Sequence, residues 1–296
     1  MNEGRIAELT RRGVVAVGGP EAEHFLNNLV TAEVTRAAPG QSVLAALLSP
    51  QGKILFDFII VRDGERFMVD IARDQIEAFI KRLTMYRLRA KVTIEDVSAA
   101  NRVVALWGAN IPHIDGAAAP DPRLASLGWR IVMPSDWPVE YRDFVRVSEA
   151  DYDRHRIALG IPEGGIDFAF GDAFPHDADM DDLGGVDFDK GCYIGQEVVS
   201  RMEHRGTARR RFITVTADAA LPAPGTELKA GERPVGTLGS SADGSGLALV
   251  RLDRAKEALD AGTPIMADGT PVTLTIPGWA EFGWPESAPE AEPAGG

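Results

Sequence analysis

The chain has 296 residues, a formal net charge of −13 and one cysteine. That length accommodates two or three domains with apolar cores. A chain this acidic has no overall cationic field for phosphate groups, so nucleic acid is not a predicted partner. One cysteine excludes an internal disulfide, as in proteins of a reducing compartment. No apolar run reaches the roughly 20 residues that span a membrane, and no cleavable leader is recognised, so a cytoplasmic protein without a membrane partner is predicted.

The first half of the chain alternates apolar strands with amphipathic helices. Residues 13–17 form a predicted strand, and Gly19-Pro20 begins a predicted helix because proline is tolerated at the first helical position. Residues 42–48 and 54–61 flank the turn Ser49-Pro50-Gln51-Gly52 and are predicted to pair as a hairpin. Apolar spacing of three and four predicts a further helix over 74–84. The other predicted strands of this half are 67–71, 91–95, 103–107 and 129–133.

The second half combines a helix, a long loop and a run of short strands. Residues 151–159 are predicted as an amphipathic helix that ends before Gly160 and Pro162. Residues 163–189 are acidic and rich in glycine, and a loop of that length predicts a functional segment. Its aspartates at 177–182 lack EF-hand spacing and are predicted to be solvated. Short strands between Pro/Gly turns predict a small barrel, from 212–216, 235–238, 247–251 and 272–276, with a helical piece over 253–260.

The single cysteine lies in the stretch KGCYIGQEVVSRMEHRGTARRR, which runs from Lys190 to Arg211. Cys192 stands between Gly191 and Gly195, just before a helix predicted to begin at Gln196. The unpaired N–H groups and positive dipole end of a helix favour a thiolate. A lone cysteine is otherwise most often a small buried apolar residue. Because its neighbours are glycine and polar residues, a functional thiol is the favoured interpretation.

The same stretch contains a local concentration of positive charge. From Ser200 to Arg211 there are five arginines and one glutamate. These arginines can meet RNA, an anionic ligand tail or the acidic run at 177–182, and RNA ranks last because the chain as a whole is acidic. His204 lies in this stretch and His176 lies near it, but they lack the spacing of metal ligands, and no metal site is predicted.

The run KGCYIGQE, followed by R-x-x-H-R-G-x-A-R-R, resembles the YgfZ-type folate-binding proteins, which are relatives of the aminomethyltransferase (T-protein) of the glycine cleavage system. The resemblance covers nearly the whole chain. It implies an α+β, three-lobed aminomethyltransferase-like fold, with two α/β sheet domains around a central cavity and a small C-terminal β-barrel. The implied domains are residues 1–48 with 139–210, residues 49–138, and residues 211–284, followed by a disordered tail at 285–296.

The resemblance also implies a function. The implied function is that of a tetrahydrofolate-binding accessory protein that takes part in the assembly or repair of iron–sulfur clusters and affects tRNA-modifying enzymes, with Cys192 as a reactive thiol. The expected partners are folate and the iron–sulfur assembly machinery or its client proteins. In the T-protein, folate lies in a hole at the centre of the three domains, and a pterin with a glutamate tail needs apolar walls, a carboxylate or amide, and cations. The candidate folate-binding residues are Asp57, Tyr86, Arg156, Glu163, Lys190, Tyr193, Gln196, Glu197, Arg201 and Arg205.

A folate-dependent one-carbon (aminomethyl) transferase is the alternative function. Two departures from the T-protein weaken it. Where the T-protein has adjacent acidic residues, this chain has Phe56-Asp57, and where it has a pterin-binding glutamate, this chain has Ala158. Methylene transfer needs carboxylates to steer the amine. For Cys192 itself, ligation of iron, a mixed disulfide and acceptance of a one-carbon unit remain three open roles.

Overall fold

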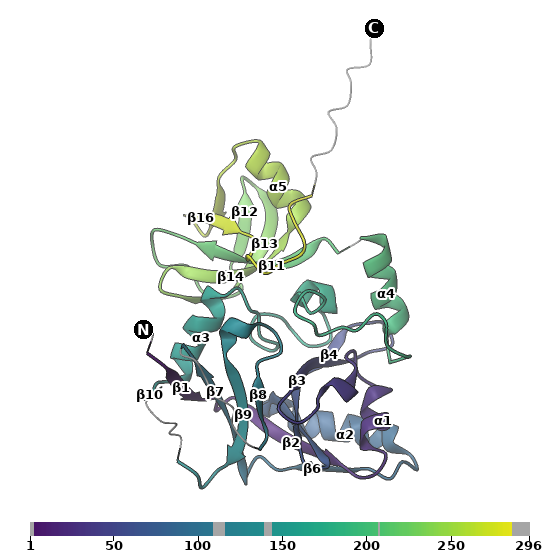
Figure 1. Cartoon of the computed structure of the whole chain (residues 1–296). Coiled ribbons are helices and arrows are strands. Elements are labelled where there is room, and N and C mark those ends of the chain that lie inside the picture. The colour runs from purple at the N-terminus through teal and green to yellow at the C-terminus, as the bar shows by residue number, and fades with distance from the viewer. Residues whose placement is uncertain (1–2, 109–115, 139–143, 207, 286–296) are drawn as a thin grey trace.

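Two five-stranded sheets and a closed barrel organise the chain, with the barrel above the sheets in Figure 1. The computed structural model describes residues 3–108, 116–138, 144–206 and 208–285. The predicted disordered tail lies outside the described residues, apart from Pro285. Among the described residues, no helix is long and apolar enough to cross a membrane.

The first sheet has the strand order β3-β4-β5-β2-β6 and contains the predicted hairpin. Successive side chains of a strand point to opposite faces. Ile59 and Val61 therefore pack toward the second sheet, whereas Phe58 and Ile60 pack toward the helices on the other face. The strands are β2 (Arg12–Gly18), β3 (Ser42–Leu48), β4 (Ile54–Asp63), β5 (Arg66–Ala72) and β6 (Thr93–Asp96).

The second sheet has the order β10-β1-β7-β9-β8 and shares one apolar core with the first. Ala105 and Trp107 of this sheet belong to the same cluster of buried side chains as Ile59 and Val61. Three of its strands are too short to produce a detectable periodic pattern and were not predicted. The strands are β1 (Arg5–Glu8), β7 (Asn101–Trp107), β8 (Ala118–Pro120), β9 (Trp129–Pro134) and β10 (Val145–Arg146).

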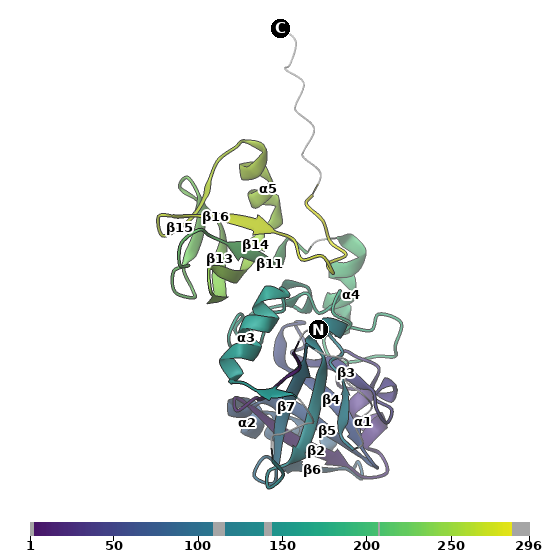
Figure 2. The ribbon, with the colours of Figure 1, turned by 60° about the vertical axis from the view of Figure 1, so that its left-hand side comes forward.

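Helices occupy three positions around the sheets. α1 (Ala22–Asn27) and α2 (Ile76–Arg87) cover the outer face of the first sheet. α3 (Glu149–Ala158) lies between the sheets and the barrel in Figure 2 and begins with a capping box between Ser148 and Asp151. α4 (Gln196–Arg205) projects at the side of the molecule in Figure 1. Short 3₁₀ turns are η1 (Val34–Arg36), η2 (Arg73–Gln75), η3 (Ala125–Leu127) and η4 (Pro175–Ala178).

The C-terminal part is a closed barrel with the strand order β11-β14-β13-β12-β15-β16. α5 (Leu252–Asp260) packs its buried leucine and alanines on the barrel core. The α+β architecture with two sheets and a C-terminal barrel is as predicted. The strands are β11 (Arg210–Thr216), β12 (Glu227–Ala230), β13 (Arg233–Ala242), β14 (Ser245–Arg251), β15 (Ile265–Ala267) and β16 (Thr270–Thr275).

Two details differ from the sequence-based expectations. The implied domain boundary between residues 48 and 49 falls at the turn of the β3–β4 hairpin, so the first sheet runs across it. The aspartates at 177–182 are not all solvated, since Asp177 and Asp179 are buried, with 3% and 0% of their surface exposed. Arg210 of β11 pairs with Asp177 at 2.6 Å, which offsets the cost of burying that charge, and Arg211 lies 3.6 Å from Asp179.

Candidate functional site

Cys192 is exposed on a segment that crosses the edge of the first sheet. The next two side chains go to opposite sides of that edge. Tyr193 is buried in the core between the two sheets, and Ile194 packs against the core beneath α1 and α2. Because β3 is the edge strand, the segment straddles β3 and leaves the thiol facing outward.

A close backbone approach fixes the end of this segment against the hairpin. Gly195 has φ of 82°, and a Cβ at this position would lie 2.6 Å from the Ser49 carbonyl oxygen. A Cβ at Gly52, in the hairpin turn, would lie 3.0 Å from the Val198 side chain. Only glycine combines this backbone conformation with this approach. Gly195 therefore allows the start of α4 to pack directly against the β3–β4 turn.

Lys190 anchors the other end of the segment. Its Nζ donates to the backbone oxygens of Asn27, Val30 and Ala32 at 2.7, 2.8 and 2.7 Å. Burial lowers the pKa of Lys190 to about 8, with Glu33 and Asp187 opposing the shift. The group is thus still protonated at neutral pH and has three N–H donors for three carbonyls. Lys190 is committed to the backbone around the end of α1 and offers no free charge for a ligand.

Asp187 and Tyr193 complete the anchoring. Oδ1 of Asp187 accepts the backbone N–H groups of Asp189 and Lys190 at 3.0 and 3.1 Å, and Oδ2 pairs with Arg36 at 2.7 Å. Burial and Asp187 raise the pKa of Tyr193 to about 12. The Tyr193 hydroxyl has no hydrogen-bond partner in the described part of the chain. Tyr193 therefore acts chiefly as an apolar anchor of the loop.

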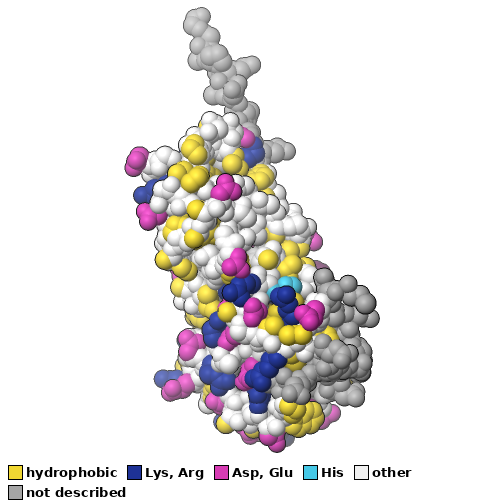
Figure 3. All heavy atoms as spheres, turned by 90° about the vertical axis from the view of Figure 1, so that its left-hand side faces the viewer, with side chains coloured by type: hydrophobic (Ala, Val, Ile, Leu, Met, Phe, Trp, Pro, Cys, Tyr) yellow, Lys and Arg dark blue, Asp and Glu magenta, His cyan; other side chains and the backbone are white. Residues whose placement is uncertain are grey.

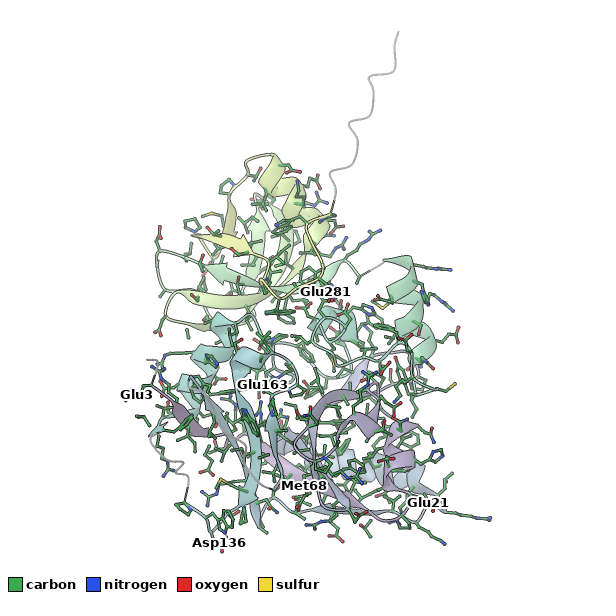
Figure 4. The ribbon with its side chains drawn as sticks, viewed as in Figure 1. Glu3, Glu21, Met68, Asp136, Glu163 and Glu281 are labelled. Atoms are coloured by element: carbon green, nitrogen blue, oxygen red, sulfur yellow. The ribbon has the colours of Figure 1, made fainter. Side chains whose placement is uncertain are left out.

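A small cavity lies where the sheets, α3 and the long loop meet. Its free volume is about 30 Å³, and two of the predicted folate-binding residues, Asp57 and Glu163, line it. Glu163 lies near the middle of the molecule, below the barrel, in Figure 4. Four arginines also border the cavity, Arg11, Arg12, Arg123 and Arg130.

Ion pairs fill the centre around this cavity. Arg12 pairs with Asp70 at 2.6 Å and approaches Glu163 at 3.9 Å. Burial acts to lower the pKa of Arg12, but Asp70 and Glu163 outweigh it and the net shift is upward. Arg130 binds both Asp70 at 3.4 Å and Asp121 at 3.1 Å. The two sheets are thus joined by buried charges as well as by apolar packing.

Arg156, a third predicted folate contact, does not line the cavity and instead contacts the barrel. It is 1% exposed and pairs with Asp167 at 2.7 Å and Glu163 at 3.2 Å. Its Nη2 also donates to Ser240 of the barrel at 2.9 Å, while Oδ1 of Asp167 accepts the Ser240 N–H at 2.7 Å. All of these contacts are within the protein, so Arg156 connects α3, the long loop and the barrel.

Asp57 provides the clearest test of whether tetrahydrofolate fits the centre. Its Oδ1 is buried and has no hydrogen-bond partner among the described residues, a suitable acceptor for N–H groups at a pterin edge. Burial raises the pKa of Asp57, Glu163 adds to the shift and Arg12 opposes it. Drug-sized ligands nevertheless occupy pockets of roughly 300–1,000 Å³, whereas about 30 Å³ is free here. With these side-chain positions the donor set suits a pterin, but the space does not accommodate it.

The remaining predicted contacts lie away from the centre. Tyr86, at the end of α2, packs against the core on the opposite face of the first sheet from Asp57. The four candidates on α4 do not line the central cavity. Glu197 and Arg201 form a surface ion pair at 2.6 Å, and pairs this exposed contribute at most about 1 kcal/mol. The two other candidates on α4 are the half-exposed Gln196 and the exposed Arg205.

Two of the three arginines after α4 meet the acidic run, whereas Arg209 is 67% exposed and lies near Asp253. Arg210 pairs with Asp177, and Nη1 and Nη2 of Arg211 each donate to an oxygen of Asp181 at 2.6 Å. Of the three alternatives, pairing with the acidic run is therefore correct for these two arginines. On the face drawn in Figure 3, basic side chains are interspersed with acidic ones.

Comparisons with known proteins support both halves of the architecture. Residues 2–119 match the family model described as the GCVT N-terminal domain, and residues 209–282 match that described as the CAF17 C-terminal beta-barrel domain. The crystal structure of glycine cleavage system aminomethyltransferase T from Bartonella henselae has a TM-score of 0.74. It covers 94% of this chain and 87% of its own, at 18% identity, and so shows the fold alone.

Two relatives that align with this chain over more than four-fifths of their own length share the same name. The mitochondrial iron–sulfur cluster assembly factor IBA57 of Mus musculus is 31% identical over 95% of this chain and 85% of its own. The human protein of that name is 31% identical over 94% of this chain and 84% of its own. These names place the relatives in mitochondria, which contradicts the predicted cytoplasmic location. The name IBA57 also narrows the broader resemblance to YgfZ-type proteins.

Proposed function

Because the chain belongs to the family of IBA57 iron–sulfur cluster assembly factors, we propose that it acts in the assembly of iron–sulfur clusters and that Cys192 is its reactive group. The observation that carries the proposal is the outward-facing thiol on a segment anchored at both ends, by Lys190 and by Gly195. Such anchoring holds a ligand atom in place before a partner arrives.

One cysteine limits what this thiol can do alone. Iron–sulfur clusters of the common types are held by four cysteine thiolates, and this chain supplies one. We therefore propose that Cys192 provides one thiolate to a cluster or iron whose other ligands belong to a partner of the assembly machinery. Ligand exchange of this kind needs no change of oxidation state at sulfur. A mixed disulfide with a partner thiol is the competing role.

The proposal is tested by Cys192→Ser in cells from which the native gene has been deleted. The expected result is that the wild-type chain restores the activity of iron–sulfur enzymes and the variant does not, at equal protein levels. Full restoration by Cys192→Ser would remove the thiol role. A covalent adduct between this chain and a partner that survives denaturing gels and disappears with a reductant would show that Cys192 forms a mixed disulfide and does not act as a metal ligand.

We propose tRNA-modifying iron–sulfur enzymes among the clients. This follows from the resemblance to YgfZ-type proteins and is tested in the same cells. Modified nucleosides made by such enzymes are expected to fall in the deletion strain and to return with the wild-type chain. Their persistence at normal levels in the deletion strain would exclude these clients.

Tetrahydrofolate binding is a second proposal, favoured by the unpartnered Oδ1 of Asp57. It requires the side chains around the central cavity to move apart. Titration of the purified protein with tetrahydrofolate tests it. Saturable binding weakened by Asp57→Asn is the expected result if folate enters the centre. No saturable binding would remove folate, and with it one-carbon transfer, while leaving the role of Cys192 untouched.

A further inference from the structure

A second group of ligand atoms converges between α4, η4 and the barrel, separate from Cys192. Nε2 of His176 lies 3.0 Å from Oε2 of Glu203 and 4.0 Å from Oδ2 of Asp181. All three ligand atoms lie within 4.8 Å of one another. Spacing along the chain does not reveal this group, because the fold brings together residues from η4, the following turn and the end of α4.

The three ligand atoms cannot all present lone pairs to one another. Two carboxylate oxygens facing one imidazole nitrogen repel each other unless a proton or a metal ion lies between them. His176 is 1% exposed, and without a metal its Nε2–H donates to Glu203 at 3.0 Å. Its Nδ1 has no hydrogen-bond partner within the described ranges, so moving the proton to Nδ1, which frees the Nε2 lone pair for a metal ion, breaks no hydrogen bond at Nδ1.

The surrounding charges leave a deficit of positive charge at this point. Arg211 is the guanidinium in contact with Asp181, and it also lies 3.6 Å from the fully buried Asp179. Oδ2 of Asp179 has no hydrogen-bond partner among the residues that the structure describes. Arg211 balances Asp181, and Glu203 adds a further negative charge beside His176. A cation bound between the two carboxylates would balance that remaining charge.

Arg211 also orients the group. Its nitrogens donate to both oxygens of Asp181 at 2.6 Å, and Nη1 donates to the backbone oxygen of His176 at 3.0 Å. Ligating carboxylates are commonly held in this way by outer hydrogen bonds. Of the three residues, Glu203 is the one whose side chain can change position most easily, because it is 44% exposed.

We propose that His176, Asp181 and Glu203 bind one divalent first-row transition-metal ion, such as Zn²⁺ or Fe²⁺. Imidazole with two carboxylates is a donor set that such ions accept. Tetrahedral ligands at about 2.1 Å from a metal are about 3.4 Å apart, and the observed separations reach that value through small side-chain shifts. The three residues border a cavity of about 670 Å³, which leaves the fourth position open to water or an added ligand. Glu281, labelled in Figure 4, borders the same cavity at the foot of the barrel.

The test uses the full chain carrying Cys192→Ser, so that the thiol cannot bind the probe. Co²⁺ is titrated under visible absorption, and Zn²⁺ is then added as a competitor. We expect one Co²⁺ per chain, with ligand-field bands that Zn²⁺ removes. Glu203→Gln is expected to weaken binding at least tenfold. Glu197→Gln, a matched change on the exposed face of the same helix, is expected to leave binding unchanged.

Thermal unfolding provides a second readout, because a ligand that binds only the folded chain raises its midpoint. Zn²⁺ is expected to raise the midpoint of the Glu197→Gln chain but not that of the Glu203→Gln chain. Glu203 is half-exposed, so its substitution leaves the fold intact. Absence of saturable binding, or equal binding by the two variants, would overturn the proposal and leave the contact as a hydrogen bond from Nε2–H of His176 to Glu203.

Discussion

The ammonium group of Lys190 donates a 2.7 Å hydrogen bond to the backbone oxygen of Asn27, and so joins two segments 163 residues apart in the sequence. Two further carbonyls, of Val30 and Ala32, share the same nitrogen. Since Cys192 follows two residues later, the position of the thiol depends on the segment that follows α1. The charge that the sequence suggested for a folate tail serves instead to hold the loop.

Lys190→Met is expected to release this loop. It leaves the carbonyl oxygens of Val30 and Ala32, which are buried, and that of Asn27, which is partly buried, without this donor, and each unsatisfied buried group costs about 1–3 kcal/mol. A loss of roughly 3 kcal/mol in the free energy of unfolding is expected from urea titration, together with a changed rate of Cys192 alkylation. Lys229→Met, at an exposed lysine of β12, is the control and is expected to change neither. Unaltered stability and alkylation in Lys190→Met would contradict the anchoring role.

Asp57→Asn is expected to stabilise the chain. Burial raises the folded-state pKa of Asp57. At pH values above the pKa of Asp57 in the unfolded chain, the folded chain therefore binds more protons than the unfolded chain. The free energy of unfolding falls as the pH rises through this range. Asparagine does not titrate, so the variant is expected to gain about 1 kcal/mol, or roughly 2 °C, at pH 7 and less near pH 4. Unfolding curves at the two pH values measure this, and a variant less stable than wild type at pH 7 would show that ionised Asp57 is stabilised by its neighbours.

Arg156→Met is expected to loosen the barrel from the sheets. The variant leaves Asp167, whose side chain is fully buried, without its cation. Breaking a buried pair in this way costs roughly 3–5 kcal/mol. Adding Asp167→Asn is expected to recover part of that loss, because the unpaired charge is then removed.

Arg154→Met is the matched control on α3. Arg154 is 49% exposed and pairs with Asp151 at the surface, where such pairs contribute at most about 1 kcal/mol. Urea unfolding of the three variants measures the difference. Similar losses for Arg154→Met and Arg156→Met would show that the buried node does not hold the barrel.

Most of the fold was predictable because its longer elements have clear periodicity. The β3–β4 hairpin, α2 and α3 follow from apolar spacing and turn residues. The short strands β1, β8 and β10 were not predicted, because two to four residues cannot display a period. Their place in the second sheet is set by pairing, of β1 with β7, of β8 with β9 and of β10 with β1, which is a tertiary effect.

The site was less predictable, because sequence shows which residues are charged but not what they contact. The motif predicts Cys192 as a candidate site residue, and that stays a prediction, whereas the ion pairs at the centre were missed. A signal for them existed, since Asp70 and Arg130 interrupt apolar strands, and a charge in a buried strand needs a partner. Arg12 is 58 residues from its partner Asp70, and Asp121 precedes Arg130 by nine residues across the loop before β9, so both pairings become evident only in the folded chain.

Gly195→Ala is expected to disturb the display of Cys192 without touching the thiol. Alanine at φ of 82° has a backbone cost of about 1–2 kcal/mol, and its Cβ would lie 2.6 Å from the Ser49 oxygen and 3.1 Å from Gly52 Cα. The start of α4 must then move off the hairpin. A loss of at least about 2 kcal/mol in stability and reduced restoration of iron–sulfur enzyme activity are expected.

Gly191→Ala is the control within the same motif, because a Cβ at that position would have no atom within 4 Å and the φ of Gly191 is not positive. Equal behaviour of the two alanine variants would show that the close approach at Gly195 does not position the thiol.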